Sequence, residues 1–157
     1  MFLVGGCSQE PPKGQEEYSI YYIDNTETRL VEEMFSIDEN DDPETVIVKL
    51  LDKLAGVPNS LTCKRVLPEN LNVRKEDIIL EHNGRLTIRF PELYYQTTGI
   101  KEILCRSAIV KTICQVNEVK DIQFYVKGQP LKGADDKEVG FMSDTDFLYY
   151  IETVQLN

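Results

Sequence analysis

Residues 103–131 read ILCRSAIVKTICQVNEVKDIQFYVKGQPL, and this stretch joins a helical pattern to a strand pattern. Apolar residues recur at helical spacing, which predicts a well-buried helix over about 100–116 with Thr98 or Gly99 as its cap. Residues 120–127 then alternate between apolar and polar, which predicts a strand that ends at the break in 128–130. The positions expected in the core are Ile100, Ile103, Leu104, Ala108, Ile109, Ile113 and Val116 of the helix and Ile122, Phe124 and Val126 of the strand.

A hairpin is predicted upstream of this helix. Two strand-like runs, 78–82 and 85–90, are joined by Asn83-Gly84, a dipeptide typical of a two-residue hairpin turn. The second run alternates, so one of its faces should be buried. Its expected core positions are Leu86, Ile88 and Phe90.

A second hairpin and a helix are predicted nearer the amino terminus. The runs 18–24 and 29–37 are rich in β-branched and aromatic residues and are separated by the turn 25–28. The acid-rich segment 38–44 lacks the spacing and the glycine of a calcium-binding EF-hand loop, so it indicates a helix start. Asp42 is expected to cap a helix that begins at Pro43, runs to about Ala55 and ends at Gly56.

The predicted order is therefore β-β-α-β-β-α-β, with one more strand over 147–154, where a helix is not excluded. This order predicts an α+β fold with a mostly antiparallel sheet and two helices on one face. With 157 residues the chain has the length of one domain.

Composition and charge exclude several classes of function. No run reaches the ~18 apolar residues of a membrane-spanning helix. Lys and Arg total 17 and Asp and Glu total 27, for a net charge of -10. No basic cluster is present to replace the counterions of a nucleic acid, so nucleic acid is not an expected partner. An anionic membrane surface should also repel the folded body.

Residues 1–17, MFLVGGCSQEPPKGQEE, combine a short apolar stretch with a polar segment of linker composition, and the two meet at Cys7. The stretch 3–7 resembles a bacterial lipobox, in which small residues precede a cysteine that is lipidated on its sulfur. Six residues precede Cys7 and none is basic, whereas a secretory signal has a basic region and a longer apolar run. Either the front of the signal is missing from this sequence, or the terminus is frayed and Cys7 is a free thiol.

Few residues suggest catalysis. The single histidine, His82, flanks the Asn-Gly turn and is expected to be exposed, and no metal or cofactor motif is present. Cys105 and Cys114 are expected to pack in apolar surroundings, and a disulfide from either one to Cys63 stays open. Paired carboxylates of the glycosidase kind are not excluded, because acids are abundant. Tyr94-Tyr95 and Tyr149-Tyr150 are the aromatic pairs expected to include exposed members.

The segment from the second helix onward resembles the GerMN (sporulation and spore germination) domain. In that family an A-I-V-x-T-L helix is followed by a V-x-x-V-x-F-x-V-x-G-x-P-L strand and turn, and residues 108–113 and 119–131 match this pattern with Ile113 in place of Leu. Upstream pieces, and 140–142 with Phe147, also fit, so the resemblance covers about 18–151. It implies a fold like the ring-building modules of envelope machines, an extracytoplasmic lipoprotein of Gram-positive bacteria, and no catalytic site.

These observations predict two parts: a truncated lipoprotein signal and tether in 1–17, lipidated at Cys7, and a single GerMN-like domain in 18–154. The leading hypothesis is a non-catalytic, lipid-anchored interaction module on the extracytoplasmic face of the cell membrane. Its role is in sporulation, germination or the cell envelope, its partners are envelope proteins or further copies of itself, and it has no cofactor and no metal. The alternative is a small cell-wall-acting enzyme or enzyme accessory that uses paired carboxylates. A cytosolic scaffold is a third hypothesis.

Overall fold

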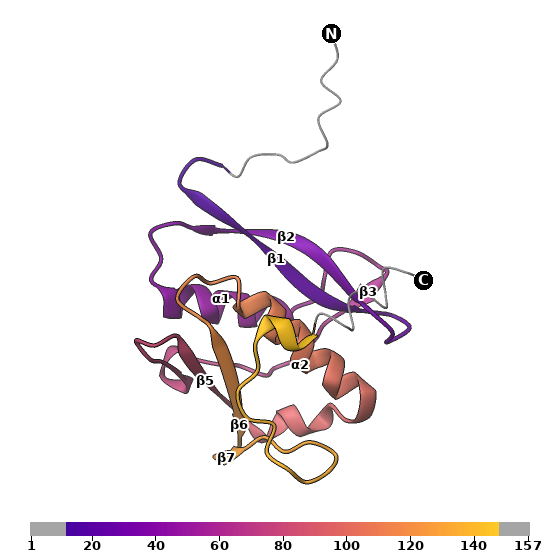
Figure 1. The fold of residues 1–157 in the computed structure, drawn as a ribbon. Helices are drawn as coiled ribbons and strands as arrows, with labels where there is room; N and C mark the ends of the chain where they lie inside the picture. The colour runs from indigo at the N-terminus through magenta and orange to yellow at the C-terminus, as the bar shows by residue number, and fades with distance from the viewer. Residues whose placement is uncertain (1–11, 148–157) are drawn as a thin grey trace.

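The structure, a computed structural model, describes residues 12–147 of the chain. The first element in this range is a long antiparallel hairpin (Figure 1). β1 (Gln15–Asp24) pairs with β2 (Leu30–Asp38) from Gln15 opposite Asp38 to Ile23 opposite Leu30. The short strand β3 (Cys63–Lys64) adds to the other edge of β1, so the first sheet has the order β2-β1-β3. The hairpin predicted over 18–37 is confirmed; β1 begins earlier than predicted, and β2 is shifted toward the carboxyl end by one residue.

The first helix starts and ends where its sequence predicts. α1 spans Pro43–Ala55, and Asp42 Oδ1 accepts a hydrogen bond from the Thr45 backbone N at 2.9 Å. At the other end the Gly56 backbone N donates to the Lys53 carbonyl at 3.0 Å. The capping carboxylate satisfies a free N–H of the first turn, and its charge lies at the positive end of the helix dipole. The face turned to the core carries Val46, Ile47, Leu50, Leu51 and Leu54.

The second sheet contains the strands on either side of the Asn-Gly turn. A short 3-10 turn, Lys75–Asp77, leads into β4 (Ile78–Leu80), which pairs antiparallel with β5 (Arg85–Phe90). Gly84 turns the chain with φ +92°, and the Gly84 carbonyl accepts a hydrogen bond from the Lys120 backbone N at 2.8 Å. The buried residues of β5 are the predicted ones, Leu86, Ile88 and Phe90.

The second sheet continues with a parallel pair. A 3-10 turn, Glu92–Gln96, and helix α2 (Gly99–Ile113) carry the chain across to β6 (Asp121–Val126), which lies parallel to β5. The short β7 (Gln129–Pro130) completes the order β4-β5-β6-β7. The two sheets and two helices make an α+β fold of mostly antiparallel strands, as predicted. A single sheet was expected, and the structure has two, because β1, β2 and β3 do not pair with β4–β7. Within the second sheet the α2 crossover returns β6 in the same direction as β5.

Both helices pack on one side of the β1–β2 hairpin, and Figure 1 shows them between that hairpin and the β5–β6 pair. The rings of Phe90 and Tyr94 stack with centroids 4.9 Å apart, and Phe124 meets Phe90 edge-on at 5.1 Å. This aromatic cluster joins the crossover to the strands on either side of it. The core residues of α2 include Leu104, Cys105, Ala108, Ile109, Val110 and Ile113.

The second helix and the end of the chain differ in part from what the sequence predicts. The helix predicted over about 100–116 ends at Ile113, and Val116 is buried in the turn that follows. Ile100, predicted in the core, is 74% exposed, and no residue of 99–103, at the start of α2, is buried. The strand predicted over 147–154 lies outside the described residues except for Phe147, which is the last residue of a 3-10 turn (Asp144–Phe147). Within 12–147, no helix is long and apolar enough to cross a membrane.

Candidate functional site

The predicted lipidation site, Cys7, lies outside residues 12–147, so lipidation there stays a prediction. β1 begins at Gln15, inside the segment predicted to be the tether. Tyr149 and Tyr150 also lie outside the described residues. The structure therefore describes only the folded body between these two segments.

The three cysteines of the body are free thiols. Cys105 is fully buried and Cys114 is half-buried, in line with the predicted apolar packing, and Cys63 is buried under the loop before β3. Burial raises the pKa of the Cys105 thiol, and burial raises that of Cys114 to about 11. These thiols are protonated at neutral pH, which makes them poor nucleophiles.

Acidic side chains that could support hydrolysis line two hollows of the body, and the smaller, of about 110 Å³, is lined by Glu16, Asp38, Glu39, Asp41 and Glu118. His82 is exposed in the β4–β5 turn, as predicted. Asp38 and Asp52 line one groove of about 510 Å³ between β2 and α1, and burial raises the pKa of Asp52. Asp38 Oδ1, however, accepts hydrogen bonds from Asn40 N at 2.9 Å and Asn40 Nδ2 at 3.2 Å, which gives this carboxylate a role in its turn. Among the described residues, no group of three or more His, Cys, Asp or Glu side chains could hold a metal ion.

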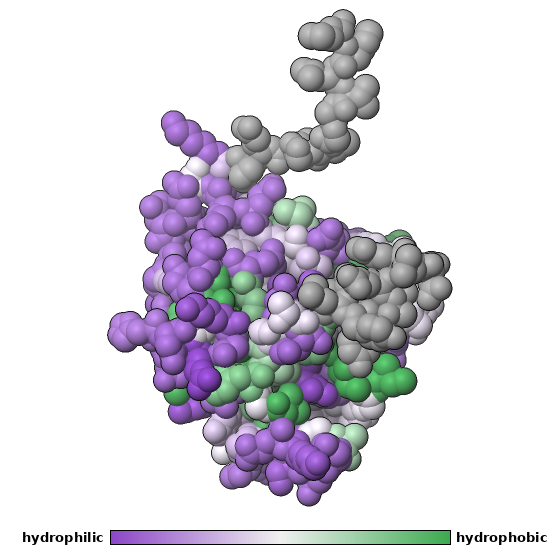
Figure 2. Space-filling model, viewed as in Figure 1, coloured by the Kyte–Doolittle hydropathy of each residue, from purple (hydrophilic) through white to green (hydrophobic). Residues whose placement is uncertain are grey.

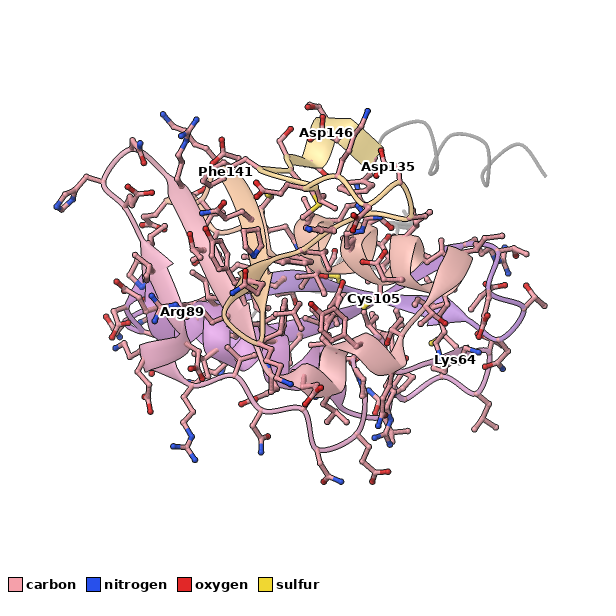
Figure 3. The ribbon with its side chains drawn as sticks, turned by 90° about the horizontal axis from the view of Figure 1, so that it is seen from below. Lys64, Arg89, Cys105, Asp135, Phe141 and Asp146 are labelled. Atoms are coloured by element: carbon pink, nitrogen blue, oxygen red, sulfur yellow. The ribbon has the colours of Figure 1, made fainter. Side chains whose placement is uncertain are left out.

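A second groove, of about 440 Å³, lies where α2 begins. One wall is the 3-10 turn and the first two turns of α2, and the other is the chain just after β7, residues 131–134. Ile100 and Tyr95, 74% and 48% exposed, lie in its lining, and Figure 2 shows hydrophobic surface at this end of α2. Figure 3 shows the loop that carries Asp135 running beside α2. This groove combines exposed apolar residues with charged ones.

The floor of the groove is a chain of polar side chains. Tyr94 Oη donates a hydrogen bond to Glu102 Oε1 at 3.0 Å, and Arg106 Nε donates to Glu102 Oε2 at 3.0 Å. The side chains of Glu102 and Arg106 are 16% and 14% exposed. The pair is one helical turn apart on α2, the spacing at which opposite charges meet. Burial raises the pKa of Tyr94 well above its usual range, which keeps this hydroxyl a donor.

Sequence reasoning located part of this site. It expected the Tyr94-Tyr95 pair to include an exposed member, and Tyr95 is half-exposed while Tyr94 is fully buried. It missed the groove because it assigned Ile100 to the core. The Glu102–Arg106 spacing was visible in the sequence, but only the fold shows that the buried Tyr94 hydroxyl joins this pair.

The sequence model of the Germane family, described as sporulation and spore germination, matches residues 19–132. The chain belongs to this family, and its body is a GerMN domain. Among curated proteins, none matches the sequence significantly.

Solved structures of GerMN domains share this fold. The tandem GerMN domains of the sporulation protein GerM from Bacillus subtilis match with a TM-score of 0.68 at 16% identity, over 83% of this chain and 47% of theirs. The first GerMN domain of that protein matches with a TM-score of 0.61 at 17% identity, over 82% of this chain and 95% of its own. This chain therefore spans about half the length of the tandem protein.

A third solved structure comes from Clostridium perfringens, from a protein described provisionally as a lipoprotein. It matches with a TM-score of 0.56 at 16% identity, over 88% of this chain and 93% of its own. At such low identity each of these likenesses concerns the fold.

Proposed function

We propose that this chain is a non-catalytic interaction module that is lipid-anchored through Cys7 on the extracytoplasmic face of the cell membrane. Membership of a family described by sporulation and spore germination supports a role in those processes. The groove at the start of α2 carries the interaction part of the proposal. Its exposed Ile100 and Tyr95 lie together in the lining of a groove of about 440 Å³ with a few polar side chains, and such a combination is typical of binding sites.

The anchor part of the proposal draws on the amino-terminal sequence. Small residues precede Cys7, and a segment of linker composition follows it. The provisional description of the Clostridium perfringens protein as a lipoprotein adds support. Two acyl chains on a glyceryl thioether at Cys7 would give stable attachment, which a single chain does not. A tether would also keep the acidic body of this chain, whose total net charge is -10, off an anionic membrane surface.

The partners in this proposal are proteins of the cell envelope, including further copies of this chain. No nucleic acid and no cofactor are among them. The acidic charge disfavours nucleic acid, because binding to phosphates requires a basic surface.

Metabolic labelling with a fatty-acid analogue tests the anchor in cells that express the chain from its own gene. The parent protein should carry the label and fractionate with membranes, and Cys7→Ala should lose both properties. Cys114→Ala is the matched control, since that thiol lies in the body, and it should keep the label. Equal labelling of the parent and the Cys7→Ala variant would refute the anchor.

A further inference from the structure

The groove at the start of α2 differs in charge from the rest of the molecule. The chain as a whole has a net charge of -10, whereas the charged residues that line the groove are Glu102, Arg106 and Lys132. Lys132 is within 3.8 Å of Asp136, which partly compensates the charge of this lysine. At physiological salt the Debye length is about 8 Å, so local charges outweigh distant ones. The lining itself holds two cations and one carboxylate, and Arg106 is the cation that a negatively charged group would meet inside the groove.

Arg106 has hydrogen-bonding capacity left over. Its Nε–H is engaged by Glu102, and within residues 12–147 no acceptor takes a hydrogen bond from Nη1 or Nη2. A guanidinium presents a fixed fork of donors that suits a carboxylate. Glu102 binds the Nε side of Arg106 and is itself held by the Tyr94 hydroxyl, so the Nη donors that no acceptor in 12–147 engages are left for an outside acceptor.

The apolar walls of the groove require that a ligand also carries an apolar group. Ile100 and Tyr95 stand exposed at the groove and Leu131 is buried beside them. An apolar side chain laid between these residues would lose its contact with water and contribute about 25 cal/mol per Å² of apolar surface buried. A ligand that fits both features has an apolar group next to a carboxylate.

We propose that this groove binds a peptide segment of a partner protein in which an apolar side chain neighbours an Asp or Glu. This inference rests on the proposed function as an interaction module and names its surface and the chemistry of its partner. A peptide is favoured over a small molecule because the apolar residues Ile100 and Tyr95 are exposed, whereas small-molecule sites bury most of their ligand.

Binding of short synthetic peptides to the full chain tests this inference. The probe is a set of labelled peptides with Asp beside varied apolar residues, and each has a partner peptide with Asn in place of Asp. We expect Asp peptides to bind and to shift the amide resonances of Gly99, Gly133 and Ala134. Replacing Asp by Asn should weaken binding about tenfold or more, because a hydrogen bond to a charged group is lost.

Variants of the groove locate the binding site. Arg106→Gln should weaken binding of the Asp peptide about tenfold and leave binding of the Asn peptide unchanged. Ile100→Ser changes an exposed residue, so the protein stays folded, and it should weaken both peptides. Arg89→Gln is the matched control: Arg89 is exposed, and Figure 3 shows it on the opposite side of the view from α2.

The inference is overturned if no peptide of the set binds with a Kd below about 1 mM, or if Asn peptides bind as well as Asp peptides. It is also overturned if Arg89→Gln weakens binding as much as Arg106→Gln, or if hexanoate shifts the same amide resonances with equal affinity. Equal affinity for hexanoate would make the groove a small-carboxylate site. A dimer in sedimentation that Ile100→Ser abolishes would show a second copy in the groove and would also overturn it. The acyl-labelling test uses Cys7→Ala and not these variants, so the anchor and the groove can fail separately.

Discussion

The side chain of Gln115 takes the place of a neighbouring strand along one edge of β1 at Ser19. Gln115 Oε1 accepts a hydrogen bond from the Ser19 backbone N at 2.8 Å, and Gln115 Nε2 donates to the Ser19 carbonyl at 2.6 Å. Thr112 Oγ1 accepts from the Tyr21 backbone N at 3.1 Å in the same way. Since β3 pairs only with Ile23 and Asp24, these side chains satisfy backbone groups that the sheet leaves free and fix α2 against the hairpin.

Gln115→Leu should therefore destabilise the fold by about 1–3 kcal/mol, because two partly buried backbone groups lose their partners. Urea unfolding followed by circular dichroism measures the change. Gln129→Ala, at an exposed position, should change stability by about 0.5 kcal/mol or less. If the two variants are equally stable, the role assigned to Gln115 is wrong.

Stability should fall in acid because of Asp24 in the first hairpin turn. Burial alone would raise the pKa of this carboxyl, but hydrogen bonds from the Thr26 hydroxyl and from Thr28 N and Arg29 N, at 2.8 and 3.0 Å, outweigh burial and lower it to about 2. The folded-state pKa lies below the unfolded value, so the contribution is present above about pH 4 and is lost as pH falls toward 2. Its size is about 2 kcal/mol.

Urea unfolding between pH 7 and pH 2 measures this loss. Asp24→Asn should be less stable than the parent at pH 7, and the difference should shrink as pH falls from 4 to 2. Asp136→Asn, whose side chain is 91% exposed, is the control and should follow the parent. Parallel curves for the parent and Asp24→Asn over this interval would contradict the assignment.

Gly84 should not tolerate a side chain. Its φ is +92°, and a Cβ there would lie 2.7 Å from Lys120 Cγ. Gly84→Ala should cost about 1–3 kcal/mol of stability from backbone strain alone. Gly133→Ala, where the nearest atom is the carboxylate oxygen of the Asp135 side chain at 3.2 Å, should cost less. Thermal unfolding of the two variants side by side checks the order, and the reverse order would refute it.

The thiols of the folded body should react slowly. In a Cys7→Ala background at pH 8, Cys114, with a pKa of about 11, should react with a disulfide reagent roughly a hundredfold more slowly than a free thiol. Cys105, which is fully buried, should react only when the protein unfolds. In concentrated urea all three remaining thiols should react rapidly. Fast reaction of Cys105 in the folded protein would mean that its helix opens readily.

Local patterns allowed most elements to be predicted. Asp42, Pro43 and Gly56 delimit α1 because capping and φ preferences act within a few residues of the chain. The Asn83-Gly84 turn and the alternation that follows it defined β5 and its buried face for the same reason. The resemblance in 103–131 pointed to the GerMN domain, because core and turn residues carry that pattern.

The candidate groove could be predicted only in part. That the Tyr94-Tyr95 pair would include an exposed member could be predicted, but these residues form a 3-10 turn, so strand alternation does not decide which of the two is buried. The exposure of Ile100 does not follow, because helical periodicity places it on the same face as Leu104, and only the fold shows that the start of the helix is not buried. Paired carboxylates were abundant in the sequence, yet which acids share a groove depends on segments far apart in the chain.

By itself, the sequence determined the order of the elements, their inward faces and the family, since these depend on short-range spacing of apolar, turn and capping residues. Tertiary structure alone decided that β5 and β6 pair in parallel within a second sheet, that Gln115 completes the edge of β1, and that Tyr94, Glu102 and Arg106 form the floor of a groove. Each of these depends on contacts between residues distant in the chain, or on what a neighbouring segment leaves uncovered. Local periodicity carries no information about either.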